Sequence, residues 1–170
     1  LYTVKEKLKT LNGVTLSYVG DGNNVCNSLL FICAKLGVNM RIGSPQGYEP
    51  ERKVFSFSKS QAERNNAYVK LFSNPFDAVK GADIIYTDVW ASMGQEKETA
   101  KRKKAFGDFQ INSKLVNSTG KRSTLVMHCL PAHRGEEITD EVLDSKNSVV
   151  FDQAENRMHV QKAVLIKLLG

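Results

Sequence analysis

Three short clusters of polar residues in this sequence have types and spacing that could bind a small charged molecule. They are Gly20-Asp21-Gly22-Asn23-Asn24, the segment from Asp88 to Gly94, and His128-Cys129-Leu130-Pro131. Each cluster directly follows an apolar run short enough to be a buried strand. Because open α/β sheets bind ligands at the carboxyl ends of their strands, the three clusters could line one crevice.

The glycine-rich cluster could bring the backbone close to an anion at the start of the next helix. It begins like a dinucleotide-binding fingerprint, but Val25 stands where the third glycine would be, and Arg41 rather than an acid stands near the end of the next predicted strand. This pattern is weak support for NAD binding. The amides of Asn23 and Asn24 could instead bind a carboxylate or an amine, and the alternative is a turn with an asparagine helix cap.

Asp88 ends an otherwise apolar run, where its carboxylate could form charge-assisted hydrogen bonds with an ammonium group. Ser92 adds a hydroxyl, and Gly94 would give flexibility to a loop that could close over a ligand. The alternative is an aspartate that only caps the following turn.

Cys129 could act as a nucleophile, but the sequence offers no clear base beside it. His128 is adjacent along the expected strand and should therefore point to the opposite face of the sheet. His133 and His159 lack metal-ligand spacing to the cysteines, so we expect no metal site. The alternative for Cys129 is a buried structural thiol.

Two charged segments could also contact a ligand. Glu155-Asn156-Arg157 is expected to open the last helix, where Arg157 could hold a phosphate or a carbonyl oxygen; a solvated helix face is the alternative. The basic run from Lys97 to Lys104 has only Phe106 as a nearby aromatic, so it lacks the pattern of single-strand nucleic-acid binding. The net charge of +6 favours anions in general.

The elements that must position these clusters alternate along the chain. Apolar runs predict strands at residues 14–19, 38–42, 69–72, 83–87 and 124–127, with a possible sixth at 149–151. Helices are expected between them, including two opened by capping boxes at Thr3 with Glu6 and at Ser60 with Glu63, the second after a loop over residues 43–57. This alternation predicts a three-layer α/β/α fold with a mainly parallel, Rossmann-like sheet.

Length and composition predict one globular domain over residues 1–170, with 41% hydrophobic and 25% charged residues. No apolar run approaches the roughly 20 residues that span a bilayer, so no membrane association is expected. The three cysteines are too few and odd in number for a disulfide framework, and we expect a cytoplasmic protein with Cys26 and Cys33 in its core.

Taken together and in order, these clusters resemble the C-terminal, ornithine-binding domain of the ornithine carbamoyltransferases. The matching pieces are Asp21-Gly22-Asn23-Asn24, Asp88-Val89-Trp90 with Ser92-Met93-Gly94-Gln95-Glu96, His128-Cys129-Leu130-Pro131 and Glu155-Asn156-Arg157. The resemblance implies a transferase of arginine metabolism that moves the carbamoyl group of carbamoyl phosphate to the side-chain amine of L-ornithine. The products would be L-citrulline and phosphate, and no cofactor would be needed.

The resemblance also implies a role for each matched residue. The residues implied to bind ornithine are Asn24, Asp88, Ser92 and Met93, with Asp88 at the α-ammonium group. Those implied to contact carbamoyl phosphate are Cys129, Leu130 and Arg157. Cys129 and Arg157 would be the catalytic residues, with Cys129 orienting the reactants rather than attacking, and Asn23 is a plausible neighbour.

Members of this family also have an N-terminal carbamoyl phosphate-binding domain, and their active sites lie between the subunits of a trimer. Residues 1–9 resemble the end of the helix that joins the two domains, and the serine-threonine-arginine-threonine turn of the first domain does not occur here. We therefore expect this chain alone to bind ornithine weakly and to catalyse little. Two alternatives stay open, namely a carbamoyltransferase for another amine or amino acid, and a non-catalytic nucleotide-binding α/β module.

Overall fold

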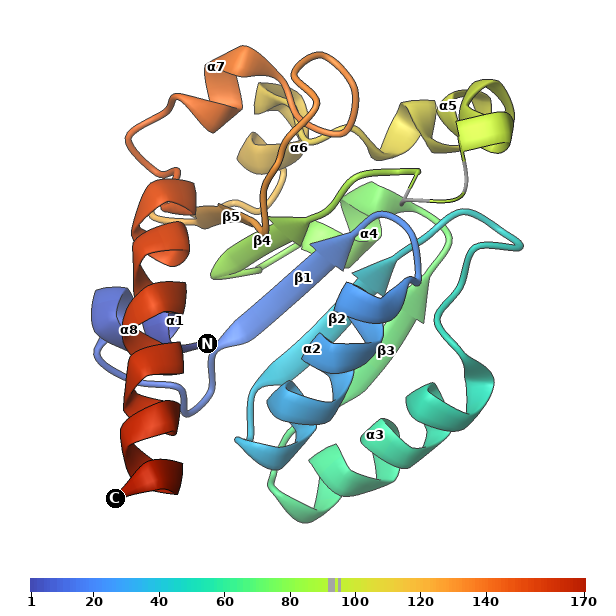
Figure 1. Ribbon diagram of the computed structural model, residues 1–170. Helices are drawn as coiled ribbons and strands as arrows, with labels where there is room; N and C mark the ends of the chain where they lie inside the picture. The colour runs from blue at the N-terminus through green and yellow to red at the C-terminus, as the bar shows by residue number, and fades with distance from the viewer. Residues whose placement is uncertain (92–93, 95) are drawn as a thin grey trace.

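A computed structural model describes residues 1–91, 94 and 96–170 of the chain, with only the backbone of Glu96. It contains one sheet of five parallel strands in the order β3-β2-β1-β4-β5 (Figure 1). The strands are β1 (Thr15–Val19), β2 (Asn39–Gly43), β3 (Val69–Phe72), β4 (Ile84–Thr87) and β5 (Leu125–His128). The strand order reverses direction between β1 and β4, so the loops after these two strands diverge and leave room for a ligand.

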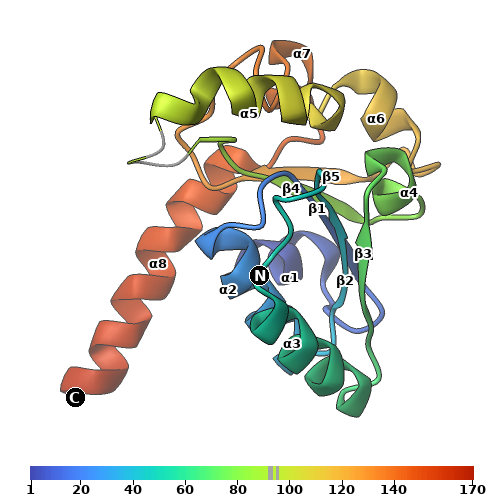
Figure 2. The same ribbon diagram turned by 90° about the vertical axis from the view of Figure 1, so that its right-hand side faces the viewer.

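Helices cover both faces of the sheet, and the two views show them as separate layers (Figures 1 and 2). On one face lie α1 (Tyr2–Leu8), α2 (Asn24–Lys35), α3 (Arg52–Arg64) and α8 (Val150–Leu169). On the other lie α4 (Pro75–Val79), α5 (Thr99–Phe106), α6 (Ser113–Asn117) and α7 (Asp140–Leu143), with 3-10 turns η1 (Glu96–Glu98) and η2 (Gly107–Phe109) beside α5. The predicted three-layer α/β/α fold with a parallel sheet is confirmed.

Strands of the sheet send alternate side chains into two separate cores. On β5, Val126 packs with the α4 to α7 layer and Met127 with the α1 and α2 layer. Because side chains alternate along a strand, His128 and Cys129 must face opposite layers, as the sequence predicts. Cys129 accordingly packs against the same core as Met127.

Two of the predicted element boundaries are wrong. Helix α3 begins at Arg52, so the second half of the predicted loop over 43–57 is helical and Ser60 lies inside the helix. The buried residues of this helix are Ser58 and Ala62, four positions apart. Because this buried face is short and includes a serine, the sequence shows no clear helical pattern of apolar residues. Residues 149–151 form no strand: Ser148 makes a single bridge to Val126, and α8 starts at Val150.

The early start of α8 places Glu155-Asn156-Arg157 inside this helix rather than at its opening. Thr3 and Glu6 do not cap α1 either, since α1 begins at Tyr2 and no side chain caps it. Both accept hydrogen bonds from the buried Asn156 amide, at 3.2 Å to Thr3 Oγ1 and 2.8 Å to Glu6 Oε2. The pair that looks like a local cap therefore joins α1 to α8, two helices at opposite ends of the chain.

The second half of α8 extends away from the rest of the domain (Figure 2). Apolar residues in this half of the helix are exposed, including Val160, Val164 and Leu168. Together with Tyr2 they line an apolar groove of about 480 Å³. Within the described part of the chain, no helix is long and apolar enough to cross a membrane.

Replacing Asn156 by Ala should lower the free energy of unfolding by about 1–2 kcal/mol, because two hydrogen bonds between α1 and α8 are lost. Urea unfolding followed by circular dichroism measures this loss. The neighbouring Glu155→Ala variant is the control, since Glu155 is exposed and contacts only the exposed His159 among the described residues. An Asn156→Ala chain as stable as the control would contradict the role of this link.

Candidate functional site

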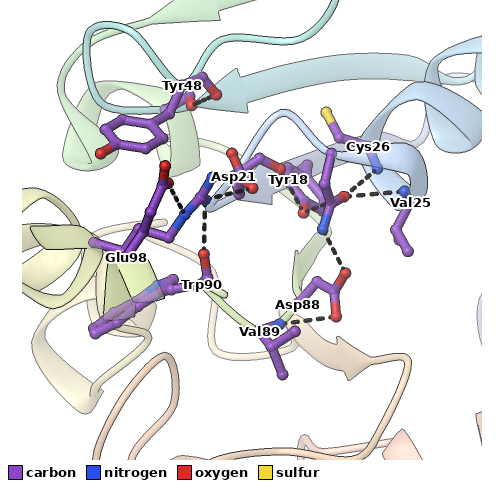
Figure 3. A network of polar contacts seen from close by, with 12 residues as sticks. Tyr18, Asp21, Val25, Cys26, Tyr48, Asp88, Val89, Trp90 and Glu98 are labelled. Carbon is purple, nitrogen blue, oxygen red and sulfur yellow. Dashed lines mark hydrogen bonds and ion pairs between the residues drawn. The ribbon is translucent and has the colours of Figure 1, made fainter. Parts of the chain in front are cut away.

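The candidate site lies where β1 and β4 end side by side, at the reversal of the strand order (Figure 3). Asn23 immediately precedes α2, and Asp88 immediately follows β4. The Asn23 amide Nδ2 donates a hydrogen bond of 2.7 Å to Asp88 Oδ2. This bond ties together the two loops that diverge at the reversal.

Asn23 uses both ends of its amide. Its oxygen accepts from the backbone N–H groups of Val25 and Cys26, at 3.0 and 3.1 Å, and so caps α2. The Tyr18 hydroxyl lies 3.3 Å from the same oxygen and donates to the Asp21 carbonyl at 2.8 Å. Asn23 therefore caps α2 through its side-chain oxygen and binds Asp88 through its side-chain nitrogen.

Asp88 is buried, and three donors converge on its carboxylate. Besides Asn23, the Val89 N–H donates to Oδ1 at 2.8 Å and the Cys129 thiol donates to Oδ1 at 2.9 Å. A carboxylate offers about four lone-pair positions, so acceptor capacity remains for a further donor. The three corners predicted to share a crevice, at Asn23-Asn24, Asp88 and Cys129, are thus brought together.

The thiol of Cys129 is held in its protonated form. Burial raises its pKa, and the hydrogen bond and negative charge of Asp88 raise it further. A nucleophilic cysteine needs the opposite surroundings, with nearby positive charge that stabilises the thiolate. The site therefore favours a neutral thiol that donates a hydrogen bond.

Behind the Cys129 turn lies a fully buried pair formed by His128 and Glu137. The Leu130 N–H donates to His128 Nδ1 at 2.8 Å, so the ring proton is on Nε2, which donates to Glu137 Oε1 at 3.0 Å. Glu137 Oε1 also accepts from the His133 N–H at 2.6 Å. The pair therefore braces the turn on both sides, including Leu130, whose φ of 57° is disfavoured for a residue with a Cβ.

Two buried charged residues beside the site, Glu137 and Arg102, are not evident from the sequence. Glu137 stands beside Glu136 in a polar segment, and nothing local indicates that it is buried. Arg102 belongs to a basic run expected to be solvated, yet it is buried and pairs with Asp21 Oδ2 at 2.8 Å. Burial raises the pKa of the Asp21 carboxyl, and Arg102 opposes that rise. The one available signal was Glu98 four residues before Arg102, a spacing typical of helical ion pairs.

The other predicted site residues have different surroundings. Asn24 is exposed in the first turn of α2 and lines a pocket of about 660 Å³ with Asn23, Tyr48 and Lys101. Ser92 and Met93 lie outside the described residues. Arg157 is exposed on α8, and in the described chain it makes no hydrogen bond or ion pair. The structure thus gathers Asn23, Asp88 and Cys129. It places Asn24 next to Asn23 on the wall of this pocket and does not connect Arg157 to the cluster.

One group of side chains has the spacing of metal ligands. His133, Glu136 and Glu137 place one ligand atom each within 4.8 Å of one another. Lys103 pairs with Glu136 at 2.6 Å, and Glu137 already accepts the bonds from His128 and the His133 backbone. Both carboxylates therefore have partners within the protein.

Comparison with known proteins identifies close relatives. Residues 12–168 match the family model described as the Asp/Orn binding domain of aspartate/ornithine carbamoyltransferase. The chain is 54% identical over 168 residues to an ornithine carbamoyltransferase of Pyrococcus horikoshii, covering 99% of this chain and 53% of that protein. It is 50% identical to a relative from Thermoplasma acidophilum named as a catabolic ornithine carbamoyltransferase, covering 99% of this chain and 55% of that protein.

Solved structures agree with this comparison. Ornithine carbamoyltransferase from Pyrococcus furiosus superposes with a TM-score of 0.91 at 54% identity, over 96% of this chain and 52% of that one. The enzyme from Gloeobacter violaceus also superposes with a TM-score of 0.91, at 45% identity, over 100% of this chain and 56% of that one. The chain thus spans about half the length of the relatives it matches.

The Cys129 thiol should react slowly with iodoacetamide at neutral pH, because Asp88 and burial raise its pKa. In Asp88→Asn the pKa should fall and labelling should accelerate, since each pKa unit changes the thiolate fraction about tenfold. Mass spectrometry of the labelled chain gives the rate at Cys129. Cys26 and Cys33 are buried, and burial raises the pKa of Cys33 to about 12, so Cys129→Ser should be nearly inert. Rapid labelling of the unaltered chain would contradict a protonated thiol.

Glu137→Ala should lower the free energy of unfolding by about 2 kcal/mol or more, because it leaves two buried donors without an acceptor. Those donors are the His128 ring and the His133 N–H. Glu137→Gln retains an oxygen acceptor and should lose less stability in urea unfolding. Equal stability of the two variants would contradict the bracing role of this carboxylate.

Proposed function

This chain belongs to the aspartate/ornithine carbamoyltransferase family, and we propose that it is the ornithine-binding part of an ornithine carbamoyltransferase. In the proposed reaction, the neutral side-chain amine of L-ornithine attacks the carbonyl carbon of carbamoyl phosphate. A C–N bond forms, the bond from carbon to the phosphate oxygen breaks, and the amine loses a proton. The products are L-citrulline and phosphate. The observation that carries this proposal is the cluster of Asn23, Asp88 and Cys129 at the reversal of the strand order.

The buried Asp88 carboxylate supports an amino-acid substrate, because it offers an acceptor for an ammonium group inside a crevice. We assign to it the α-ammonium group of ornithine. Asn24, exposed beside it, would hold the α-carboxylate together with Ser92 and Met93. Putrescine lacks both the α-ammonium and the α-carboxylate, so the same cluster favours ornithine over a simple diamine.

For carbamoyl phosphate we assign Cys129, Leu130 and Arg157. The protonated thiol would donate a hydrogen bond and orient the reacting groups, and the Leu130 backbone is braced in place by His128. Arg157 would supply positive charge to the phosphate end. Catalysis would then depend on positioning the reactants and on stabilising charge that develops on the carbonyl oxygen.

A nucleotide-binding module is the less suitable alternative for a specific reason. Phosphates bind helix N-termini through the first backbone N–H groups. At α2 two of these groups, from Val25 and Cys26, already donate to the Asn23 side chain. A phosphate would have to displace this cap, and Val25 would add bulk where the dinucleotide fingerprint needs glycine.

The relatives are nearly twice as long as this chain, so the proposed enzyme includes further parts. We propose that these include an N-terminal carbamoyl phosphate-binding domain and that the enzyme is built on trimers. The apolar groove along α8 and Tyr2 offers a surface for such contacts. The unpaired thiols of Cys26, Cys33 and Cys129 suit a reducing compartment such as the cytoplasm.

Ornithine binding tests this proposal directly. Calorimetric or NMR titration of the chain should detect L-ornithine and should show weaker binding of putrescine and of NADP. Asp88→Asn should weaken ornithine binding about tenfold or more, because a charged hydrogen bond contributes roughly 1.5–3 kcal/mol. Asn24→Ala is a second variant at an exposed position, so its effect on affinity does not depend on the buried Asp88 network.

Ser28→Ala is the matched control, since Ser28 is exposed one turn further along α2. It should leave the affinity for ornithine unchanged. Tighter binding of NADP than of ornithine would favour the nucleotide-binding alternative. Unchanged ornithine affinity in both Asp88→Asn and Asn24→Ala would place the substrate elsewhere.

A further inference from the structure

We propose that Arg102 is a positioning residue for ornithine binding, whose guanidinium holds Trp90, two residues after Asp88, and Glu98 of η1 against the turn after β1. This inference rests on the proposed function and extends it to a residue that need not touch the substrate. Asp21 belongs to the turn that carries Asn23 and Asn24.

A single guanidinium makes all the required contacts (Figure 3). Nη1 of Arg102 donates to Asp21 Oδ2 at 2.8 Å and to the Trp90 carbonyl at 2.9 Å. Nε donates to Glu98 Oε2 at 3.3 Å. The guanidinium carbon lies 5.0 Å from the centre of the Tyr48 ring, on the loop after β2. Arg102 thus connects the loops that follow β1, β2 and β4.

The burial of this ion pair indicates a role beyond stability. Arg102 and Asp21 are each only 7% exposed. Removing two charges from water costs about as much as their attraction returns, so a buried pair is weak evidence for stabilisation and better evidence for a defined geometry. The planar guanidinium can bind a carboxylate and a carbonyl at fixed angles, which the point charge of a lysine cannot do. Four nearby basic residues are lysines, at positions 97, 101, 103 and 104, and only the buried one is arginine.

The turn held by Arg102 has little freedom to adjust by itself. The Gly22 N–H donates to the Tyr48 carbonyl at 2.8 Å, and a Cβ on Gly22 would lie 2.2 Å from the Pro50 nitrogen. The turn after β1 is therefore packed directly on the backbone of the loop after β2. Because this side is fixed, the guanidinium fixes the positions of Trp90 and Glu98 relative to it.

Trp90 provides a direct readout of this arrangement. It is the only tryptophan in the sequence, and its carbonyl accepts the hydrogen bond from Arg102. Its ring is buried and stacks on Phe106, with centroids 5.9 Å apart. Its fluorescence therefore reports on the segment that Arg102 holds, without any ligand.

Three altered chains separate positioning from charge neutralisation. In Arg102→Gln, we expect Trp90 emission to move to longer wavelength and ornithine affinity to fall about tenfold or more. Arg102→Lys should keep the charge but rescue the affinity only in part. The double variant Asp21→Asn/Arg102→Gln removes the unpaired buried charge, so it should recover thermal stability but neither the emission nor the affinity. Arg134→Gln is the control, because Arg134 is exposed and pairs with Asp140 and Asp144 away from the site.

The outcomes distinguish the two roles. If the double variant recovers stability, emission and ornithine affinity together, Arg102 serves only to neutralise Asp21 and the proposal is overturned. Unchanged emission and affinity in Arg102→Gln would overturn it as well. If the unaltered chain binds no ornithine, the proposed function fails, and the Trp90 emission of the same variants still decides whether Arg102 holds the segment at Trp90.

Discussion

A buried carboxylate accepts hydrogen bonds from the loops that follow three strands of this sheet, and the arrangement of the site depends on it. Asp88 belongs to the loop after β4, Asn23 to the loop after β1 and Cys129 to the loop after β5. A carboxylate that is nearly inaccessible to water must find its donors within the protein, because an unpaired buried charge costs several kcal/mol. The loops must therefore approach closely enough for Asn23 and Cys129 to reach Asp88, and this requirement defines the crevice.

The same solution recurs around the site. Glu137 is buried beneath the Cys129 turn and accepts from the His133 backbone, while Arg102 is buried beside Asp21 and donates to the Trp90 backbone. In each case a buried charge bonds to a backbone group of a loop and so fixes that loop. The loops held in this way follow the ends of strands, where the regular hydrogen bonds of the sheet stop and the backbone needs other partners.

The fold could be predicted from the sequence because its signals are local. The strands predicted at 69–72 and 83–87 lie at or within one residue of their observed bounds, since apolar runs and turn residues mark them directly. The long-range partners could not be predicted in this way. Thr3 and Glu6 have the spacing of a capping box, yet they bind Asn156, which is distant in sequence.

The site shows the same division. The convergence of Asn23, Asp88 and Cys129 follows from the topology, because carboxyl ends of parallel strands meet at one edge. The burial of Arg102 and Glu137 does not follow from it. Arg102 stands among lysines, and Glu137 stands beside another glutamate. Each is distinguished only by its partner on another element, which is Asp21 for Arg102 and His128 for Glu137. Sequence periodicity contains no information about such pairs.

The Asn23 cap explains how a fold shared with dinucleotide-binding proteins can serve a cationic group. A glycine-rich turn before a helix usually presents backbone N–H groups and a positive helix end to phosphate. Here the Asn23 oxygen occupies those donors and its amide nitrogen faces Asp88. The negative charge at the mouth of the crevice is therefore supplied by the protein itself. A site that would otherwise attract an anionic cofactor thus offers a carboxylate acceptor to an ammonium group, which agrees with the principle that function depends on the site rather than on the fold.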